Sequence, residues 1–343
     1  MIFKKKNSVD TSASTSGENA IANKEVEGLS QSQIVRRRFF RHRAAVISLG
    51  VISFITVFVF TALDFRFLGI WHVNGWWKWS PQDIPDLRFG DCPNDTVGCP
   101  TISFRPKFMG GSGFGFGDHP FGQDDIGRDF FALVMKGTQR SLSVMIVIGT
   151  IGASIGTVVG AISGFYRGKV DAILMRFTDF IITIPAIIIG SVVGYHFGNL
   201  GAMFLAFYLG LFAWTGLSRL VRGEFLTLRE REFVLAAESL GASHRRIIFR
   251  ELLPSLWPKA IIFLSLSLPG FLTTEAALSF LGIGIQEPMP SWGVMLEKAV
   301  GKAYVVPTFF FIPAVTLIVL VTALNLVGTG VSDAFDPKLE RNK

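Results

Sequence analysis

The sequence predicts an all-α membrane protein with six transmembrane helices, a disordered basic N-terminal tail and an extracytoplasmic insert between helices 1 and 2. Two observations carry this prediction. Half of the 343 residues are apolar and only 17% are charged, compared with about 25% in soluble domains. The charges also crowd into a few loops and leave long apolar runs nearly bare, which is typical of a chain that crosses a membrane several times.

The first 43 residues (1–43) are expected to form a disordered, basic tail in the cytoplasm. Residues 1–33 are polar and show no apolar period, so they offer little to bury in a core. An arginine-rich run at 36–43 then leads directly into the first apolar segment. Positive charge beside a span holds that end in the cytoplasm, and binding to anionic lipid is the alternative interpretation. We therefore assign the net charge of +7 to membrane topology and not to nucleic-acid binding.

Six apolar runs are long enough to cross a hydrocarbon core about 30 Å thick. The first covers 44–63, and after an extracytoplasmic insert at 64–137 the membrane domain of 138–330 holds the other five. Six spans place both termini on one side, and most of the 33 Lys and Arg residues lie in loops on that side, so both termini, including the tail of 331–343, are expected in the cytoplasm. The later spans are predicted at 141–165, 178–197, 200–218, 259–284 and 307–330.

The insert contains the only two cysteines of the sequence, Cys92 and Cys99. The short segment between them is rich in turn-forming residues, which can bring the two Cα atoms within reach of a disulfide, and an extracytoplasmic location lets such a bond persist. We expect this disulfide, with two free thiols as the alternative. The sequence has no paired Cys and His spacing of the kind that binds zinc, so no metal site is expected.

Glycines recur every four residues in the second predicted span. They are Gly152, Gly156, Gly160 and Gly164. This spacing puts them on one helix face, where the absence of side chains lets another helix backbone approach closely. The stripe is therefore interpreted as a packing surface.

The charged stretch at 219–258 has a helical pattern of its own. Apolar residues within 233–240 fall at helical spacing, Gly241 interrupts the run, and Ser243 is placed to cap a second helix. The second apolar stripe ends at Pro254. Two short helices joined by a glycine would lie beneath the membrane and offer a surface to a cytoplasmic partner.

This stretch resembles the EAA loop of bacterial ATP-binding-cassette importer permeases, which in that family docks into a groove of an ATPase subunit. The segment at 232–243 reads EFVLAAESLGAS, and Leu-Pro follows at 253–254. Leu235 stands where the family pattern has Glu, and Glu251 where it has Ile. The resemblance implies an ATPase-coupling loop with the positions Leu235, Ala236, Ala237, Gly241, Leu253 and Pro254, of which all but Leu235 match the family pattern.

Three further stretches resemble the dipeptide and oligopeptide branch of that family. They are HPFGQDDIGRD at 119–129, TEAALSFLGIG at 274–284 followed by PSWG at 290–293, and SDAFDP at 332–337. The resemblance covers about residues 34–340 and implies a permease subunit of the bacterial inner membrane that imports dipeptides or oligopeptides. A second permease, two cytoplasmic ATPase subunits and an extracytoplasmic peptide-binding protein are its implied partners. Import of another solute, such as nickel or an antimicrobial peptide, stays open, because the binding protein largely sets the cargo in this family.

The chain itself is expected to have no catalytic site and to bind no cofactor. Gly168-Lys169 is followed by Val170, whereas a phosphate loop needs Ser or Thr at that place, so ATP and magnesium would be bound by the partner ATPase subunits. An intramembrane protease would need a nucleophile and a base paired within the spans, and the five histidines do not provide that pairing.

Glu275 is an ionisable residue in the middle of the fifth predicted span. A charged group there costs a few kcal/mol and usually faces a cavity or a partner. Glu275 is a candidate for the translocation path, where it would meet the ammonium group of a peptide, or for a bridge to the second permease. A structural role beside Thr273 and Thr274 is the interpretation we favour.

Overall fold

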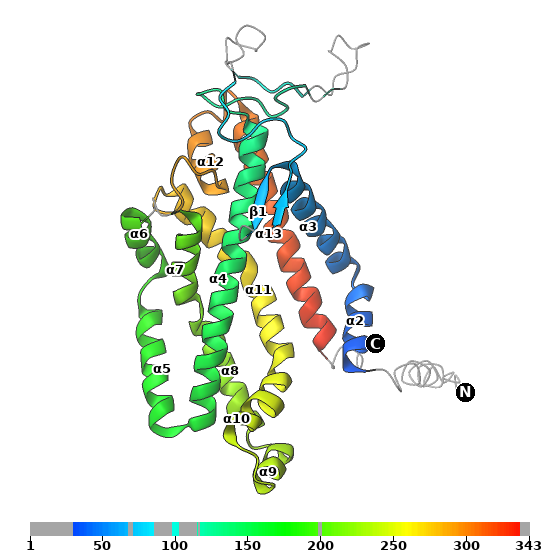
Figure 1. Ribbon diagram of the computed structural model, residues 1–343, viewed down its shortest axis with the longest axis vertical. Coiled ribbons are helices and arrows are strands. Elements are labelled where there is room, and N and C mark those ends of the chain that lie inside the picture. Colours follow the sequence, from blue (N-terminus) through cyan, green and yellow to red (C-terminus); the bar gives the residue numbers. More distant parts are fainter. Residues whose placement is uncertain are drawn as a thin grey trace, which may run out of the picture.

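The computed structural model describes residues 30–67, 71–85, 98–102, 115, 117–197 and 201–336. The described chain is mostly helical, with one small two-stranded sheet, and its long helices run along a common axis (Figure 1). In chain order the elements are α2 (Gln31–Arg41), α3 (Arg43–Ala62), β1 (Phe65–Phe67), β2 (Trp71–Val73), α4 (Phe130–Tyr166), α5 (Gly168–Thr183), α6 (Ala186–Phe197), α7 (Ala202–Ala213), α8 (Thr215–Leu228), α9 (Glu232–Ser239), α10 (His244–Arg246), the π-helix η4 (Ile247–Leu252), α11 (Leu253–Phe280), α12 (Trp292–Val300) and α13 (Pro307–Phe335).

Five helical segments within the described ranges are long and apolar enough to cross a membrane. They are Arg43–Ala62, Phe130–Tyr166, Ala202–Leu228, His244–Phe280 and Pro307–Phe335. Helices α5 and α6 together pass the same test, but they are bent by 75° against each other. The predicted membrane fold is therefore confirmed at the level of five or six spans.

The third span departs from the straight helix predicted at 178–197. Helix α5 already begins at Gly168, so most of the expected basic loop at 166–176 is helical. The chain then breaks at Ile184, whose backbone is extended, because the following Pro185 disfavours a helical conformation in the residue before it.

Two spans extend further into the charged segment at 219–258 than predicted. Helix α8 continues to Leu228, ten residues beyond the predicted end at 218. The span that contains α10, η4 and α11 begins at His244 instead of 259. The expected loop at 219–258 is therefore reduced to a short segment around α9. Hydropathy detects only the membrane-embedded part of a helix, and the polar extensions of α8 and α10 escape it.

Part of the N-terminal segment expected to be disordered is helical. Helix α2 begins after Ser30, whose side chain accepts a hydrogen bond from the Gln33 amide while the Gln33 side chain accepts one from the Ser30 amide. This reciprocal capping box stabilises the first turn of a helix. Residues 1–29 lie outside the described part of the chain.

The segment before α4 is anchored to the N-terminal end of that helix through Asp129. This buried residue caps α4 by accepting from the Ala132 amide, and it also accepts a hydrogen bond from the Trp77 indole at 2.8 Å. His119 lies against the other oxygen, with 2.9 Å between its Nδ1 and Asp129 Oδ1. Trp77 thus has a structural role here. Cys92 lies outside the described residues, so the disulfide with Cys99 stays a prediction.

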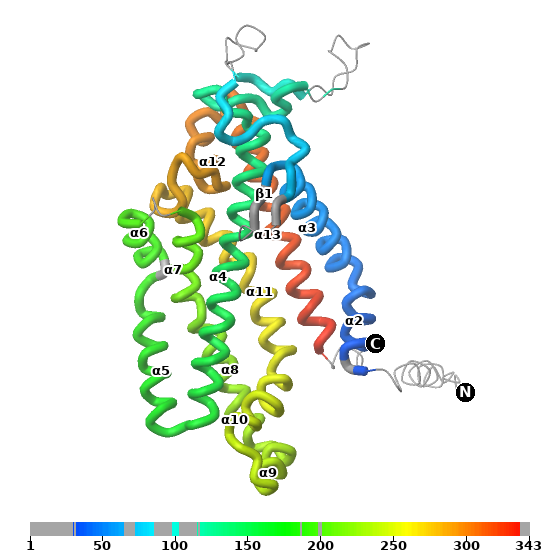
Figure 2. Tube along the Cα trace, in the orientation of Figure 1, coloured from blue at the N-terminus to red at the C-terminus, as the bar shows by residue number. Residues whose placement is uncertain are grey.

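The glycine stripe of α4 packs against α7 and α8 of the same chain, as the adjacent tubes in Figure 2 indicate. A Cβ atom on Gly156 would lie 2.8 Å from the Trp214 carbonyl oxygen, and one on Gly160 would lie 2.5 Å from that of Ser218. Such distances are shorter than any normal contact. The predicted close helix approach is therefore confirmed, and its partner is intramolecular.

Candidate functional site

Helix α9 projects beyond the membrane helices at one end of the molecule, the lower end in Figure 1. It joins the end of α8 to the start of α10. This segment, residues 229–253, contains most of the positions that the sequence singled out, and we refer to it as the coupling loop.

Gly241 ends α9 in the manner that its sequence position predicts. Its φ is +77°, a left-handed conformation that glycine adopts without steric cost. The Gly241 amide donates to the Glu238 carbonyl at 2.9 Å, and the Ala242 amide donates to the Ala237 carbonyl at 3.0 Å. These two bonds form a Schellman motif, which reverses the chain direction after a helix.

The two faces of α9 have different environments. Val234 is fully buried and packs with Ile247 and Leu252 of the next helix. On the opposite side Leu235 is 52% exposed and Leu240 is 89% exposed. Large apolar side chains exposed on a helix that projects from the protein are the kind that a partner protein can cover.

The coupling loop is fixed to the turn between α4 and α5. The Arg229 guanidinium donates to the Phe165 carbonyl and lies 5.1 Å from the centre of the Phe165 ring. Arg167, with a positive φ of 53°, forms an ion pair with Glu230 at 2.9 Å. A displacement of α9 would therefore be transmitted to the end of α4. Sequence reasoning missed this anchor, and the only signal for it is the run of aromatic and basic residues at 165–167.

The remaining predicted coupling positions lie around the buried cluster of Val234, Ile247 and Leu252. Ala236 is exposed beside Leu235, and Ala237 is half-buried against the cluster of Val234. Leu253 is half-buried and Pro254 is exposed, both in the first turn of α11. The helix does not end at Pro254 as expected, because a proline is tolerated in a first turn and the wider π-helical turn η4 lies directly before it.

Glu275 is enclosed by its own chain, with no exposed surface. Its Oε1 accepts a hydrogen bond from the Ser279 hydroxyl at 2.9 Å, and that hydroxyl accepts one from the Ile285 amide at 3.1 Å. This burial favours the structural interpretation of Glu275, and a place in the translocation path stays a prediction. In this conformation Glu275 connects the end of α11 to the loop that follows, and a passing solute cannot reach it.

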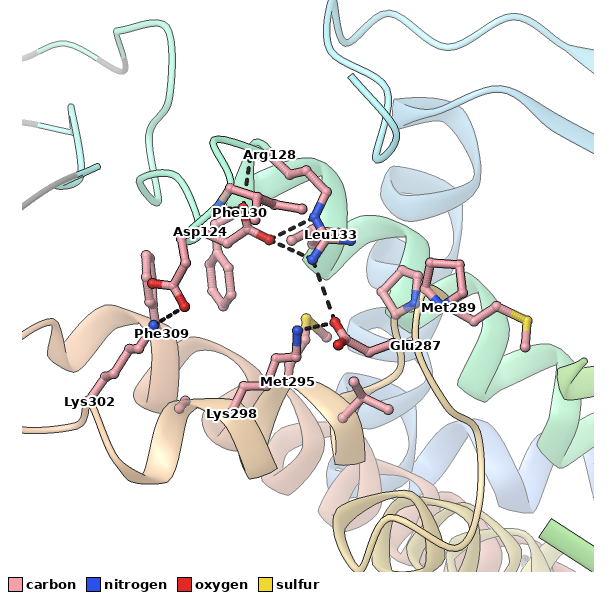
Figure 3. A pocket seen from close by; sticks show the side chains of 16 residues that line it. Asp124, Arg128, Phe130, Leu133, Glu287, Met289, Met295, Lys298, Lys302 and Phe309 are labelled. Atoms are coloured by element: carbon pink, nitrogen blue, oxygen red, sulfur yellow. Dashed lines mark hydrogen bonds and ion pairs between the residues drawn. The ribbon is translucent and has the colours of Figure 1, made fainter. Parts of the chain in front are cut away.

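A pocket of about 340 Å³ opens at the opposite end of the molecule, between the 119–129 motif and α12 (Figure 3). Arg128 lies 2.6 Å from Asp124 and 3.7 Å from Glu287. Lys298 forms an ion pair with the same Glu287. The floor is apolar and is formed by Phe130, Leu133, Met295 and Phe309.

The ion pairs around this pocket connect segments far apart in the sequence. Arg128 and Glu287 join the motif before α4 to the loop before α12, and Lys302 and Asp125 make a second connection. Because each pair is at least partly exposed, each contributes little to stability by itself. Glu287 had no sequence signal, since a lone acidic residue in a loop is usually only solvated. Among the described residues, no cluster of His, Cys, Asp and Glu has the geometry of a metal site.

Comparison with known proteins agrees with these features. The family described as "Binding-protein-dependent transport system inner membrane component" matches residues 156–341, and the "N-terminal TM domain of oligopeptide transport permease C" matches residues 30–66. The oligopeptide transport system permease protein OppC of Haemophilus influenzae is 35% identical over 315 residues, which cover 92% of this chain and 91% of that protein.

Two further similarities are more distant or partial. The glutathione transport system permease protein GsiD of Pectobacterium atrosepticum is 36% identical over 65% of this chain and 73% of that protein. A solved inward-facing structure of the MetNI methionine ABC transporter shares a TM-score of 0.49 and 20% identity, covering 60% of this chain and 96% of that one. This structural likeness is too low to carry an argument. On the family matches and the similarity to OppC, the chain belongs to the binding-protein-dependent transport system inner membrane components, as a multi-pass ABC-transporter permease of the oligopeptide type.

Proposed function

We propose that the chain forms one half of the translocation path of an ATP-driven importer of short peptides, together with a second permease. Two cytoplasmic ATPase subunits would supply the energy and bind ATP and magnesium, and an extracytoplasmic binding protein would deliver the peptide. The exposed apolar face of α9 is the observation that carries this proposal. It is a docking surface at the end of the molecule where the sequence resembles an ATPase-coupling loop.

The anchoring of the coupling loop supports a mechanism. When the ATPases close, they would move α9, and the contacts of Arg229 with Phe165 and of Glu230 with Arg167 would transmit that movement to the end of α4. Helix α4 has 37 residues, so it extends for about 55 Å. Because α4 reaches from the coupling loop to the pocket beside Arg128, here called the outer pocket, a tilt of this helix would move both regions at once.

If α9 lies in the cytoplasm, the outer pocket would face the binding protein. With α9 in the cytoplasm, Asp124, Arg128 and Glu287 face the opposite side of the membrane, and both termini lie inside. The bent pair α5–α6 would then be the sixth span. Peptide cargo is supported by the named relatives, one an oligopeptide permease and the other a permease for glutathione, itself a tripeptide.

Uptake in a strain that lacks this chain tests the cargo. Restoring the wild-type chain should restore energy-dependent accumulation of a labelled dipeptide or tetrapeptide, and unlabelled peptides should compete while nickel should not. Nickel accumulation without any peptide uptake would contradict the proposed cargo, and the family assignment would still hold.

A further inference from the structure

An open apolar groove of about 520 Å³ lies at the inner end of the molecule, between α2, α11 and α13. Phe39 and Phe40 of α2, Trp257 and Ile261 of α11, and Phe335 of α13 line it. Phe40, Trp257 and Ile261 are 56%, 52% and 43% exposed. Such large apolar side chains are not left in water when they form a continuous surface, so the groove requires an apolar occupant.

The groove lies at the boundary of the membrane. Helix α2 ends at Arg41, and the first span, α3, begins at Arg43. The Arg38 guanidinium donates to the Asp336 carbonyl at 3.2 Å, which ties α2 to the end of α13. Helix α2 thus lies where lipid headgroups meet the acyl chains, a depth at which an apolar groove is open to lipid.

One end of the groove is polar and positively charged. Ser32 and Arg36 line it beside the apolar residues. Arg36 lies 6.0 Å from the Phe40 ring centre, and it forms no ion pair in the part of the chain that the structure describes. Four further arginines stand at 37, 38, 41 and 43. In the described parts of α2 and α13, through Asp336, the acidic groups are Asp333, which faces His42 at 3.5 Å, and Asp336. The local charge is therefore positive.

We propose that this groove is a binding site for an anionic glycerophospholipid. One acyl chain lies along Phe40, Trp257 and Ile261, and the phosphate is held at the Arg36 end. A negatively charged head joined to an apolar tail matches both ends of the groove, and basic pockets beside membrane helices on the cytoplasmic side bind such headgroups. The inference depends on the membrane location of the chain and not on its cargo.

Quenching of Trp257 fluorescence by brominated lipids tests the site in the purified transporter complex in nanodiscs. The chain has seven tryptophans, so each measurement is paired with the same protein carrying Trp257→Phe, and the difference is the Trp257 signal. Brominated phosphatidylglycerol should quench that signal at about fivefold lower mole fraction than brominated phosphatidylcholine. Arg36→Gln should bring this ratio close to one, and Arg36→Lys should keep most of it.

Arg41→Gln is the matched control, because Arg41 lies on the same helix but does not line the groove. It should leave the preference nearly unchanged. An equal loss in Arg36→Gln and Arg41→Gln would show only a diffuse attraction to the basic helix and would overturn the site. Equal quenching by both lipids in the wild type, or no quenching because another chain covers the groove, would also overturn it.

Discussion

The burial of the Glu275 carboxylate favours one of two interpretations of this residue. An acidic residue within a span suits a translocation path or a structural anchor equally well when only the sequence is considered. In the structure it accepts a hydrogen bond from Ser279, four residues along the same helix, and it has no exposed surface. The burial and this bond favour a contribution to stability, and contact with a solute stays a prediction.

Replacement of Glu275 should separate these roles. Glu275→Leu leaves the Ser279 hydroxyl without its acceptor, so we expect the free energy of unfolding to fall by about 1–3 kcal/mol, measured as a lower melting temperature of the purified complex. Glu275→Gln preserves the acceptor and the shape, and should keep the wild-type melting temperature. The KM for peptide should be unchanged in both. A several-fold rise in KM for Glu275→Gln at normal stability would instead show that Glu275 contacts the peptide in the translocation path.

At the scale of helices, the small-residue face of α4 determines how closely α8 packs. Gly164 continues the pattern, since a Cβ atom there would lie 2.6 Å from the Phe225 Cβ. The spacing of the glycines predicts such an approach from the sequence. Which helix approaches cannot be predicted in this way, because the spacing on α4 says nothing about the chain that it meets.

Gly160→Leu should therefore impair folding of this chain before it affects assembly with a second permease. Overpacking of this kind costs typically about 1–3 kcal/mol, and the expected result is a lower melting temperature and less monodisperse protein in detergent. Gly50→Leu in α3 is the control, since a Cβ atom at Gly50 meets nothing within 4 Å. Equal effects of the two substitutions would contradict the packing role of the stripe.

The exposed face of α9 makes a separate prediction about the partner subunits. Leu235→Asp should leave the chain folded but reduce co-purification of the ATPase subunits about tenfold or more, because docking would bury an unpaired charge. Tyr304→Asp is the control at a fully exposed position outside the coupling loop. Normal ATPase recovery with Leu235→Asp would mean that this face does not dock.

Across the whole molecule, the sequence predicts the membrane class, the spans and the position of the coupling loop. The ends of the helices are harder to predict from the sequence, since α8 and α10 continue beyond the apolar region as polar helices that are also stable in water. The 75° bend between α5 and α6 has a local signal in Pro185. The contacts of Phe165 with Arg229 and of Arg128 with Glu287 join distant segments, and no local pattern identifies the partner of either contact.

The central claim is that movement of the coupling loop transmits ATPase closure to the membrane helices, and Gly241 tests it most directly. A Cβ atom there meets nothing within 4 Å, so a substitution acts only through the positive φ. A β-branched residue in that conformation costs about 1–3 kcal/mol and should reorient α9, whereas Asn tolerates it. The measurement is peptide uptake together with substrate-stimulated ATP hydrolysis, at matched membrane levels. We predict that Gly241→Val loses both activities while Gly241→Asn keeps most of them; native rates for Gly241→Val would contradict the coupling role of this loop.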